Sequence, residues 1–210
     1  MALAGLFFVM LSAEVARADE PLRILAFGDS LTAGFGLPDT DGFVAQLQAA
    51  LTSKGVKAKV INGGVSGDTT AGGLARLDWA LGDDPQLVIL ELGANDGLRG
   101  LDPKSTQANL DAILTRLGDQ KRAVLLAGMR APPNLGAEYA NAFDAIYPAL
   151  AERHHVALYP FFLDGVAAHA ELNQEDGIHP NAAGVKVIVG HMLPDVLKAI
   201  DGFSRTAGHP

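Results

Sequence analysis

The sequence contains no cysteine, and this absence removes several kinds of chemistry. Disulfide bonds, cysteine-rich zinc sites and thiol nucleophiles are all excluded. Positive charge is also scarce, because 16 Lys and Arg residues stand against 24 Asp and Glu residues, for a formal net charge of −8. An acidic surface repels phosphate backbones, so we do not expect nucleic acid as a partner.

The apolar stretch near the N-terminus is too short to cross a bilayer, which takes about 20 residues as a helix. Residues 3–11 (LAGLFFVML) are followed by Ala16-Arg17-Ala18, a small-residue pattern that signal peptidase reads. The pattern predicts a signal peptide over residues 1–18 and a periplasmic or secreted mature chain without a stable membrane span. No Lys or Arg precedes the apolar stretch, which leaves open a start further upstream or a buried N-terminal helix.

The remaining chain has the composition of one globular domain. Hydrophobic residues make up 49% and charged residues 19% of the 210 positions. This composition supports a substantial core, while the length leaves little room for a second domain. We therefore expect one domain over residues 19–201, followed by a flexible tail over residues 202–210.

Five short apolar runs, each closed by glycine, proline or Asn-Gly, predict the strands. They cover residues 22–27, 56–61, 87–92, 123–127 and 156–159. Continuous apolarity is typical of parallel strands that are covered on both faces. Helical spacing of apolar residues is found over residues 42–51, 74–81, 106–117, 137–153 and 181–200. The alternation predicts a three-layer α/β/α fold with a doubly wound five-stranded parallel sheet, and Pro194 is expected to kink or end the last helix early.

Functional residues of open parallel sheets gather beyond the carboxyl ends of the strands. Ser30 follows the first predicted strand, Gly67 lies in the glycine-rich loop after the second, and Asn95 follows the third. A serine at this edge can act as a nucleophile, while backbone N–H groups and an Asn side chain can stabilise an oxyanion. Each residue taken alone also fits an ordinary helix cap or turn.

Asp176 and His179 supply the acid–base chemistry that such a serine needs. An Asp three residues before a His can bond Nδ1 of the ring, which leaves Nε2 as a general base. Among the six histidines, His179 is the one with such a partner beside a helix start, whereas His154-His155 is more typical of helix capping. No third and fourth metal ligand with a convincing spacing accompanies the pair, and no glycine-rich phosphate loop is present. We therefore expect neither a metal nor a cofactor.

Together, these four segments resemble the four sequence blocks of the GDSL/SGNH hydrolase family. Residues 66–77, 91–100 and 176–181 are most similar to its bacterial thioesterase, lysophospholipase and arylesterase members, and the resemblance covers about residues 22–197. It implies a flavodoxin-like SGNH fold, with Ser30 as nucleophile and with Asp176 and His179 completing the triad. It also implies an oxyanion hole made of the Ser30 and Gly67 backbone N–H groups and the Asn95 side chain. The expected reaction is hydrolysis of small carboxylic esters or thioesters by a monomer.

The sequence leaves three alternative functions to consider. A carbohydrate-ester deacetylase would share the fold and the triad. An inactive ligand-binding domain is less consistent with the presence of every triad and oxyanion residue, and a nucleotide-binding module lacks its phosphate loop. Ala94 and residues 134–136 depart from the closest pattern, so the acyl-chain preference stays open. Four apolar residues fit either an acyl groove or the core: Leu37, Leu98, Leu135 and Phe162.

Overall fold

A computed structural model describes residues 20–206 and contains one five-stranded parallel sheet in the order β2-β1-β3-β4-β5. The strands are β1 (Leu22–Gly28), β2 (Ala58–Gly64), β3 (Leu87–Glu91), β4 (Ala123–Ala127) and β5 (Ala157–Tyr159). All four neighbouring pairs are parallel. The predicted number, type and approximate position of the strands are confirmed. The predicted signal peptide over residues 1–18 lies outside the described residues.

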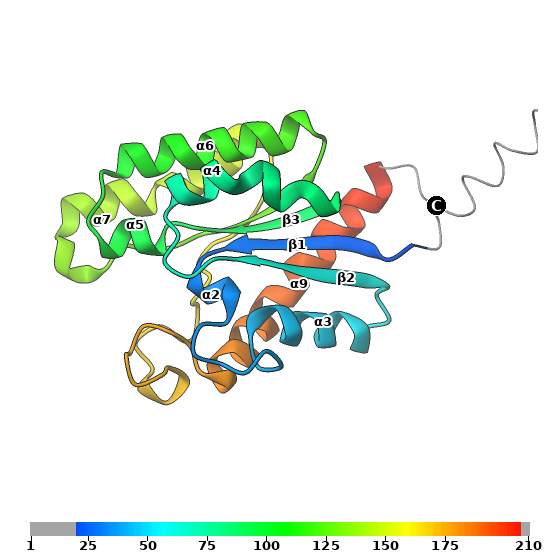
Figure 1. Ribbon diagram of the computed structural model, residues 1–210. Helices are drawn as coiled ribbons and strands as arrows, with labels where there is room; N and C mark the ends of the chain where they lie inside the picture. Colours follow the sequence, from blue (N-terminus) through cyan, green and yellow to red (C-terminus); the bar gives the residue numbers. More distant parts are fainter. Residues whose placement is uncertain (1–19, 207–210) are drawn as a thin grey trace, which may run out of the picture.

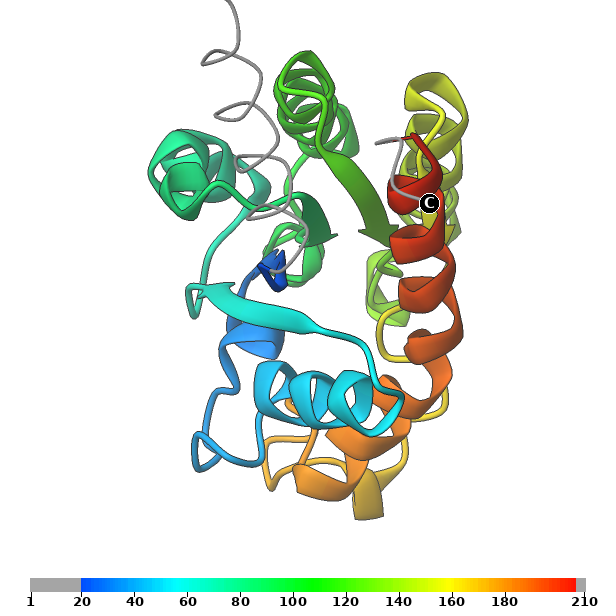
Figure 2. The same cartoon turned by 90° about the vertical axis from the view of Figure 1, so that its right-hand side faces the viewer.

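Helices cover both faces of the sheet, as the alternating pattern predicts (Figure 1). They are α2 (Ser30–Ala33), α3 (Phe43–Ser53), α4 (Thr70–Ala80), α5 (Ala94–Leu98), α6 (Pro103–Asp119), α7 (Ala137–Asp144), α8 (Ile146–His154) and α9 (Ala182–Thr206). Short 3-10 turns cover Leu81–Asp83, Pro133–Leu135 and Ala170–Leu172. Helices α4 and α6 lie together on one face and α3 and α9 on the other, and the turned view shows the sheet between these two layers (Figure 2).

The core lies where the sheet meets its two helical layers. Strand β3 is buried along its whole length, with Leu87, Val88 and Leu90 fully inaccessible to solvent. Burial of both faces explains why this strand is continuously apolar instead of alternating. Glu91, at the carboxyl end of β3, is the one polar residue of the strand.

Two helices differ from the sequence-based prediction. Residues 137–153 form α7 and α8 in place of one helix, because Pro148 has no N–H to bond the carbonyl of Asp144, where α7 ends. Pro194 does not end α9, which continues to Thr206. The carbonyl of Gly190 loses its helical partner there, but Gly190 and Pro194 are both exposed, so water can solvate it.

The predicted tail over residues 202–210 is helical through residue 206, and its last four residues, 207–210, lie outside the described part. Buried side chains on α9, such as Met192 and Val196, hold the helix against the sheet on both sides of its proline. The helical layer on this face is therefore longer than the spacing of apolar residues alone indicates.

The strand order places a topological switch point between β1 and β3. From β1 the chain moves to β2 on one side, and it then crosses to β3, β4 and β5 on the other. Parallel α/β sheets bind their ligands outside the carboxyl ends of the strands at such a point. Helices α2 and α5, which follow β1 and β3, both lie at this end of the sheet (Figure 1).

Candidate active site

Ser30 is the first residue of α2, directly beyond the end of β1. Asp29 caps this short helix, because its Oδ1 accepts the backbone N–H of Leu31 at 3.0 Å. A Cβ atom at Gly28 would overlap with the Thr32 hydroxyl and the Glu91 carboxyl group, so only glycine fits there. The tight Gly-Asp-Ser turn therefore follows from packing, and it fixes Ser30 at the switch point.

The structure brings Ser30, His179 and Asp176 together across 149 positions of sequence. Ser30 Oγ lies 3.0 Å from His179 Nε2, and His179 Nδ1 lies 2.6 Å from Asp176 Oδ2. A carboxylate at Nδ1 keeps the ring proton on that nitrogen and leaves Nε2 to accept from the serine hydroxyl. This is the arrangement that the Asp-x-x-His spacing predicts.

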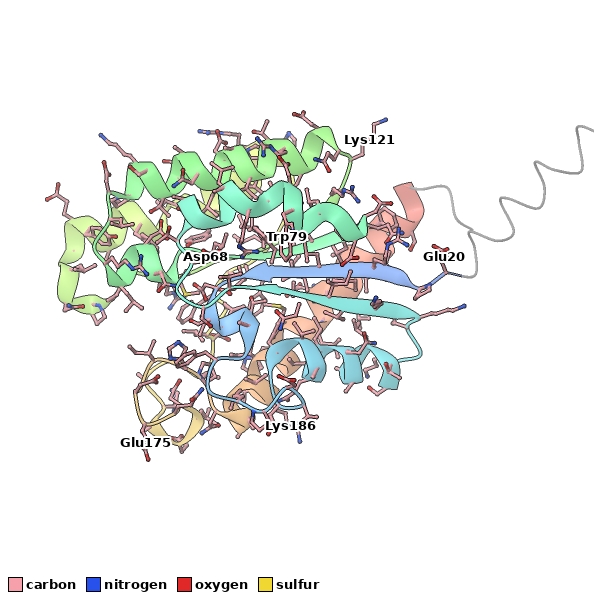
Figure 3. All side chains as sticks on the ribbon, viewed as in Figure 1. Glu20, Asp68, Trp79, Lys121, Glu175 and Lys186 are labelled. Carbon is pink, nitrogen blue, oxygen red and sulfur yellow. The ribbon has the colours of Figure 1, made fainter. Side chains whose placement is uncertain are left out.

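Asp176 is held by its own loop as much as by the imidazole ring. Its Oδ1 accepts the backbone N–H groups of His179 at 3.0 Å and Ile178 at 2.9 Å. The hydrogen bonds from the His179 backbone and side chain, followed by that from Ile178, lower the pKa of Asp176 to about 2. The group is therefore a carboxylate at any pH at which the protein is expected to work. In Figure 3, Glu175 of the same loop points outward.

Two side chains that the sequence analysis did not single out attach this loop to the segment that follows Ser30. The Phe35 ring lies against the His179 ring, with 4.6 Å between centroids. Gln174 Nε2 donates to the Phe35 carbonyl at 2.7 Å and to the Pro180 carbonyl at 3.0 Å. These contacts hold the loop of His179 against the segment that follows Ser30. No local sequence pattern predicts them.

Asn95 lies in the first turn of α5, just beyond β3, and its side chain turns towards β1. Its Nδ2 donates to Asp29 Oδ2 at 3.2 Å. An amide nitrogen carries two hydrogens, so a second donor remains for another acceptor. Asp29 thus links the loops after β1 and β3.

Gly67 lies in a turn over residues 65–68, closed by a bond from Asp68 N to the Val65 carbonyl at 3.1 Å. Its φ of +83° is the left-handed conformation that the third residue of a type II turn requires. Arg99 Nη2 donates to the Gly67 carbonyl at 2.9 Å, so the neighbouring α5 segment also holds the turn.

Arg76, another residue that sequence reasoning did not assign, connects this turn to the end of β1. Its Nε pairs with Asp68 Oδ2 at 2.5 Å, and its Nη2 donates to the Gly28 carbonyl at 2.8 Å. Both side chains of the ion pair are only 16% exposed. Asp68 lies at the carboxyl end of the sheet in Figure 3.

Glu91 is a further residue that sequence reasoning did not assign, although an acidic residue in the apolar run LVILEL is a visible signal. Its side chain is fully buried, and Thr32 Oγ1 donates to Oε2 at 2.8 Å. Burial is the main reason why the pKa of Glu91 lies well above its ordinary value.

Most of the exposed large apolar side chains lie in segments beyond the carboxyl ends of β1, β2 and β3 or in the loop that carries Asp176 and His179. Six large apolar side chains are exposed among the described residues, and one of them, Trp79, lies on α4 instead. The other five are Phe35, Val65, Leu98, Leu101 and Ile178.

The four residues predicted to line either an acyl groove or the core differ in their burial. Leu98 is half exposed, Leu135 is partly buried near Gly100, and Leu37 lines a cavity between α2 and α3. Phe162 is 1% exposed and packs on Phe43, so it belongs to the core.

Within residues 20–206, no group of three or more Asp, Glu or His side chains is placed to hold a metal ion. In the same part of the chain, no helix is both long enough and apolar enough to span a membrane.

Comparison with known proteins identifies the family of this chain. The GDSL-like lipase/acylhydrolase family matches residues 26–187. Esterase TesA of Pseudomonas aeruginosa is 41% identical over 193 residues, which cover 91% of this chain and 94% of that protein. Thioesterase 1/protease 1/lysophospholipase L1 of Escherichia coli K12 is 42% identical over 177 residues, covering 84% and 82% of the two chains.

Solved structures give the same result. AlinE4, described as an SGNH-hydrolase family esterase, is 51% identical with a TM-score of 0.73, and the match covers 86% of this chain and 97% of AlinE4. The crystal structure of TesA is 42% identical with a TM-score of 0.80, and the match covers 84% of this chain and 99% of that one. The chain therefore belongs to the GDSL-like lipase/acylhydrolase family and is a hydrolase, as the sequence blocks predict.

Proposed function

We propose that this protein hydrolyses carboxylic esters and thioesters through an acyl-enzyme on Ser30. The observation that carries the proposal is the continuous relay from Asp176 through His179 to Ser30, with contacts of 2.6 and 3.0 Å. Nucleophile, base and orienting carboxylate within hydrogen-bond reach form the signature of an activated serine.

In the acylation step, His179 Nε2 takes the proton of Ser30 Oγ as the oxygen attacks the carbonyl carbon. The electron pair of the carbonyl bond moves onto its oxygen, and the resulting oxyanion accepts from the Ser30 and Gly67 backbone N–H groups and from Asn95. When the carbonyl re-forms, the bond to the alcohol, phenol or thiol breaks, and His179 returns the proton to the leaving group where needed.

Deacylation repeats these steps with water as the nucleophile. His179 Nε2 removes a proton from water, which attacks the acyl carbon and releases the acid and free Ser30. Asp176 stabilises the imidazolium ion in both halves of the reaction and keeps Nδ1 protonated. Apart from the water consumed, the cycle uses only side chains and backbone groups of this chain.

The substrates we propose are aryl esters, acyl thioesters and lysophospholipids with short to medium acyl chains. Five exposed apolar side chains around the triad supply a surface for an acyl chain, and an acetyl group alone does not need one. The names of the relatives, which include esterase, arylesterase and thioesterase 1/lysophospholipase L1, fit the same range. We further propose that residues 1–18 direct export, so that a monomer acts in the periplasm or outside the cell.

The test is hydrolysis of p-nitrophenyl esters from acetyl to dodecanoyl by the wild type and by Ser30→Ala at matched concentrations of folded protein. We expect activity in the wild type, extending beyond butyryl, and a loss of about 10³-fold or more in kcat for Ser30→Ala. Activity on acetyl esters alone would point to a deacetylase. Full activity of Ser30→Ala, or none in the wild type, would overturn the serine mechanism.

A further inference from the structure

Two fully buried carboxyl groups lie side by side under the nucleophile turn. Asp29 follows the end of β1, and Glu91 ends the neighbouring strand β3, where the strand register pairs it with Gly28. Neither side chain is accessible to solvent. Two adjacent carboxylates in such a place would repel each other strongly, so the pair is expected to hold a proton.

The hydrogen bonds indicate which of the two groups carries the charge. Asp29 receives one donor on each oxygen, from the Leu31 backbone and from the Asn95 amide. Glu91 receives its donors on Oε2 alone, from the Thr32 hydroxyl at 2.8 Å and more weakly from the Asp29 backbone at 3.4 Å. Glu91 Oε1 is buried without a partner, and half of a negative charge on it would be uncompensated.

The charged groups around the pair also favour this assignment. Burial is the largest effect and raises the pKa of Asp29 to about 6, while the hydrogen bonds from Leu31 and Asn95 lower it. A positive charge on His179 also lowers the pKa of Asp29, whereas Asp68, whose charge is paired with Arg76, raises it. For Glu91, burial and then the charge of Asp29 raise the pKa well above the ordinary value. The Tyr147 hydroxyl, which also faces this region, donates to the Leu92 carbonyl.

We propose that Glu91 is a positioning residue that works as a neutral carboxylic acid, which leaves the single buried charge on Asp29 to hold Asn95. With one amide hydrogen bound to Asp29, the other hydrogen of Asn95 Nδ2 is directed to the oxyanion. Glu91 fixes the turn from below, by accepting from Thr32 in the space that the missing side chain of Gly28 leaves open. The inference rests on the proposed roles of Ser30 and Asn95.

The first test compares charge-neutral replacements of the two acids. Glu91→Gln keeps the acceptor for Thr32 and the neutral charge, so it should retain kcat to within about fivefold, while Glu91→Ala loses distinctly more. Asp29→Asn removes the charge that holds Asn95 and should lower kcat by about 10²-fold with KM little changed, as loss of an oxyanion donor does. Glu138→Gln, the same replacement at an exposed site on α7, serves as the control.

A double-mutant cycle shows whether Asp29 acts through Asn95. In an Asn95→Ala background, Asp29→Asn should cost much less than it does alone, because the donor that it holds is already gone. Equal losses in both backgrounds would refute this link. A loss for Glu91→Gln as large as that for Glu91→Ala would show that Glu91 is needed as an anion, which would overturn the proposal.

The second test reads the proton directly and does not depend on activity. Protein labelled with carbon-13 at the Glu side-chain carboxyl is titrated by NMR, both as the wild type and as Ser30→Ala. One signal should remain protonated above pH 7 in both proteins and be absent from Glu91→Gln. If every signal is ionised at pH 7, the proposal fails even if Ser30→Ala is inactive. If Ser30→Ala is active, the proposed function fails whatever the titration shows.

Discussion

Three Asp–His pairs lie within residues 20–206, and the two shortest have nearly equal lengths, but only one of these two faces a serine. Asp176 and His179 meet at 2.6 Å in the loop before α9, and Asp111 and His154 meet at 2.7 Å between α6 and α8. The first pair uses Nδ1 of the ring, so Nε2 is free to reach Ser30 at 3.0 Å. The second pair uses Nε2 itself, and the same carboxylate also binds Arg153 at 3.2 Å.

The two pairs have similar bonds but different surroundings, and we expect the surroundings to decide which histidine acts as a base. The Asp111–His154 pair joins the middle of α6 to the last residue of α8, away from the loops that follow β1 and β3. The Asp176–His179 pair lies where the carboxyl ends of β1 and β3 present Ser30 and Asn95. The same bond therefore links two helices in one place and, in the mechanism we propose, prepares a nucleophile in the other.

The largest expected effect on kcat comes from replacing the histidine of each pair, because only His179 is proposed to act as a base. His179→Ala should lower kcat for p-nitrophenyl esters by between about 10³- and 10⁶-fold, since it removes the base. The matched variant His154→Ala should keep kcat within about twofold. The measurement is kcat at pH 8 on proteins with matched circular dichroism. Comparable losses in the two variants would mean that the pairs do not differ in function.

Replacing each aspartate should give a smaller difference in the same direction. Asp176→Asn removes the carboxylate that keeps the proton of His179 on Nδ1. Replacing a triad Asp by Asn typically lowers kcat by about 10⁴-fold. Because the Asp176 side chain is 39% exposed, water can substitute in part, and we expect a loss between about 10²- and 10⁴-fold. Asp111→Asn, as the control, should leave kcat unchanged. The measurement is kcat of both variants at saturating ester. An unchanged kcat in Asp176→Asn would show that Asp176 has no part in the mechanism.

The smallest expected effect is a change in the pKa values of the two aspartates when their histidine partners are removed. The pKa of Asp111 is lowered first by its bond to the His154 side chain, so it should rise towards the ordinary value in His154→Ala. The pKa of Asp176, about 2, is lowered first by the His179 backbone N–H, so His179→Ala should leave it below the ordinary value of 3.8. Carbon-13 NMR titration of labelled Asp carboxyls measures both. A return of Asp176 to its ordinary pKa would show that the ring, and not the loop backbone, holds it.

The sign of the associated stability change follows from the direction of the shift. A depressed pKa means that the folded state binds the proton less tightly than the unfolded state, so Asp176 stabilises the fold above about pH 4. That contribution is lost as the pH falls towards 2, the pKa in the folded state. Asp176 is largely exposed, so solvent screening keeps this contribution small.

Much of this architecture could be predicted from the sequence, because the signals for it are local. Apolar runs closed by glycine or proline indicate the five strands, and Asp176 lies close enough to His179 for their pairing to be read from spacing alone. Ser30 and Asn95 could be placed at one edge, because parallel strands end together. Short helices such as α2 and α5 carry too few residues for a periodic pattern, and neither was predicted.

The supporting contacts were missed because they join residues that are distant in sequence. Glu91 meets Thr32 across 59 positions, and Gln174 meets the Phe35 carbonyl across 139. Sequence spacing predicts contacts only between residues that are a few positions apart. The type of a residue does not show which distant residue it will contact. The continuation of α9 past Pro194 is likewise decided by packing on the sheet and by water at an exposed carbonyl.

The most direct test of the account is covalent labelling by a p-nitrophenyl alkylphosphonate, followed by mass spectrometry of the intact protein and of its peptides. Ser30 Oγ displaces p-nitrophenol from phosphorus, and the adduct cannot be hydrolysed readily. We predict one phosphonyl group per chain, on the peptide that contains Ser30, with none on Ser30→Ala and much slower labelling of His179→Ala. An adduct on another residue, or equal labelling of Ser30→Ala, would contradict the assignment of Ser30 as the nucleophile.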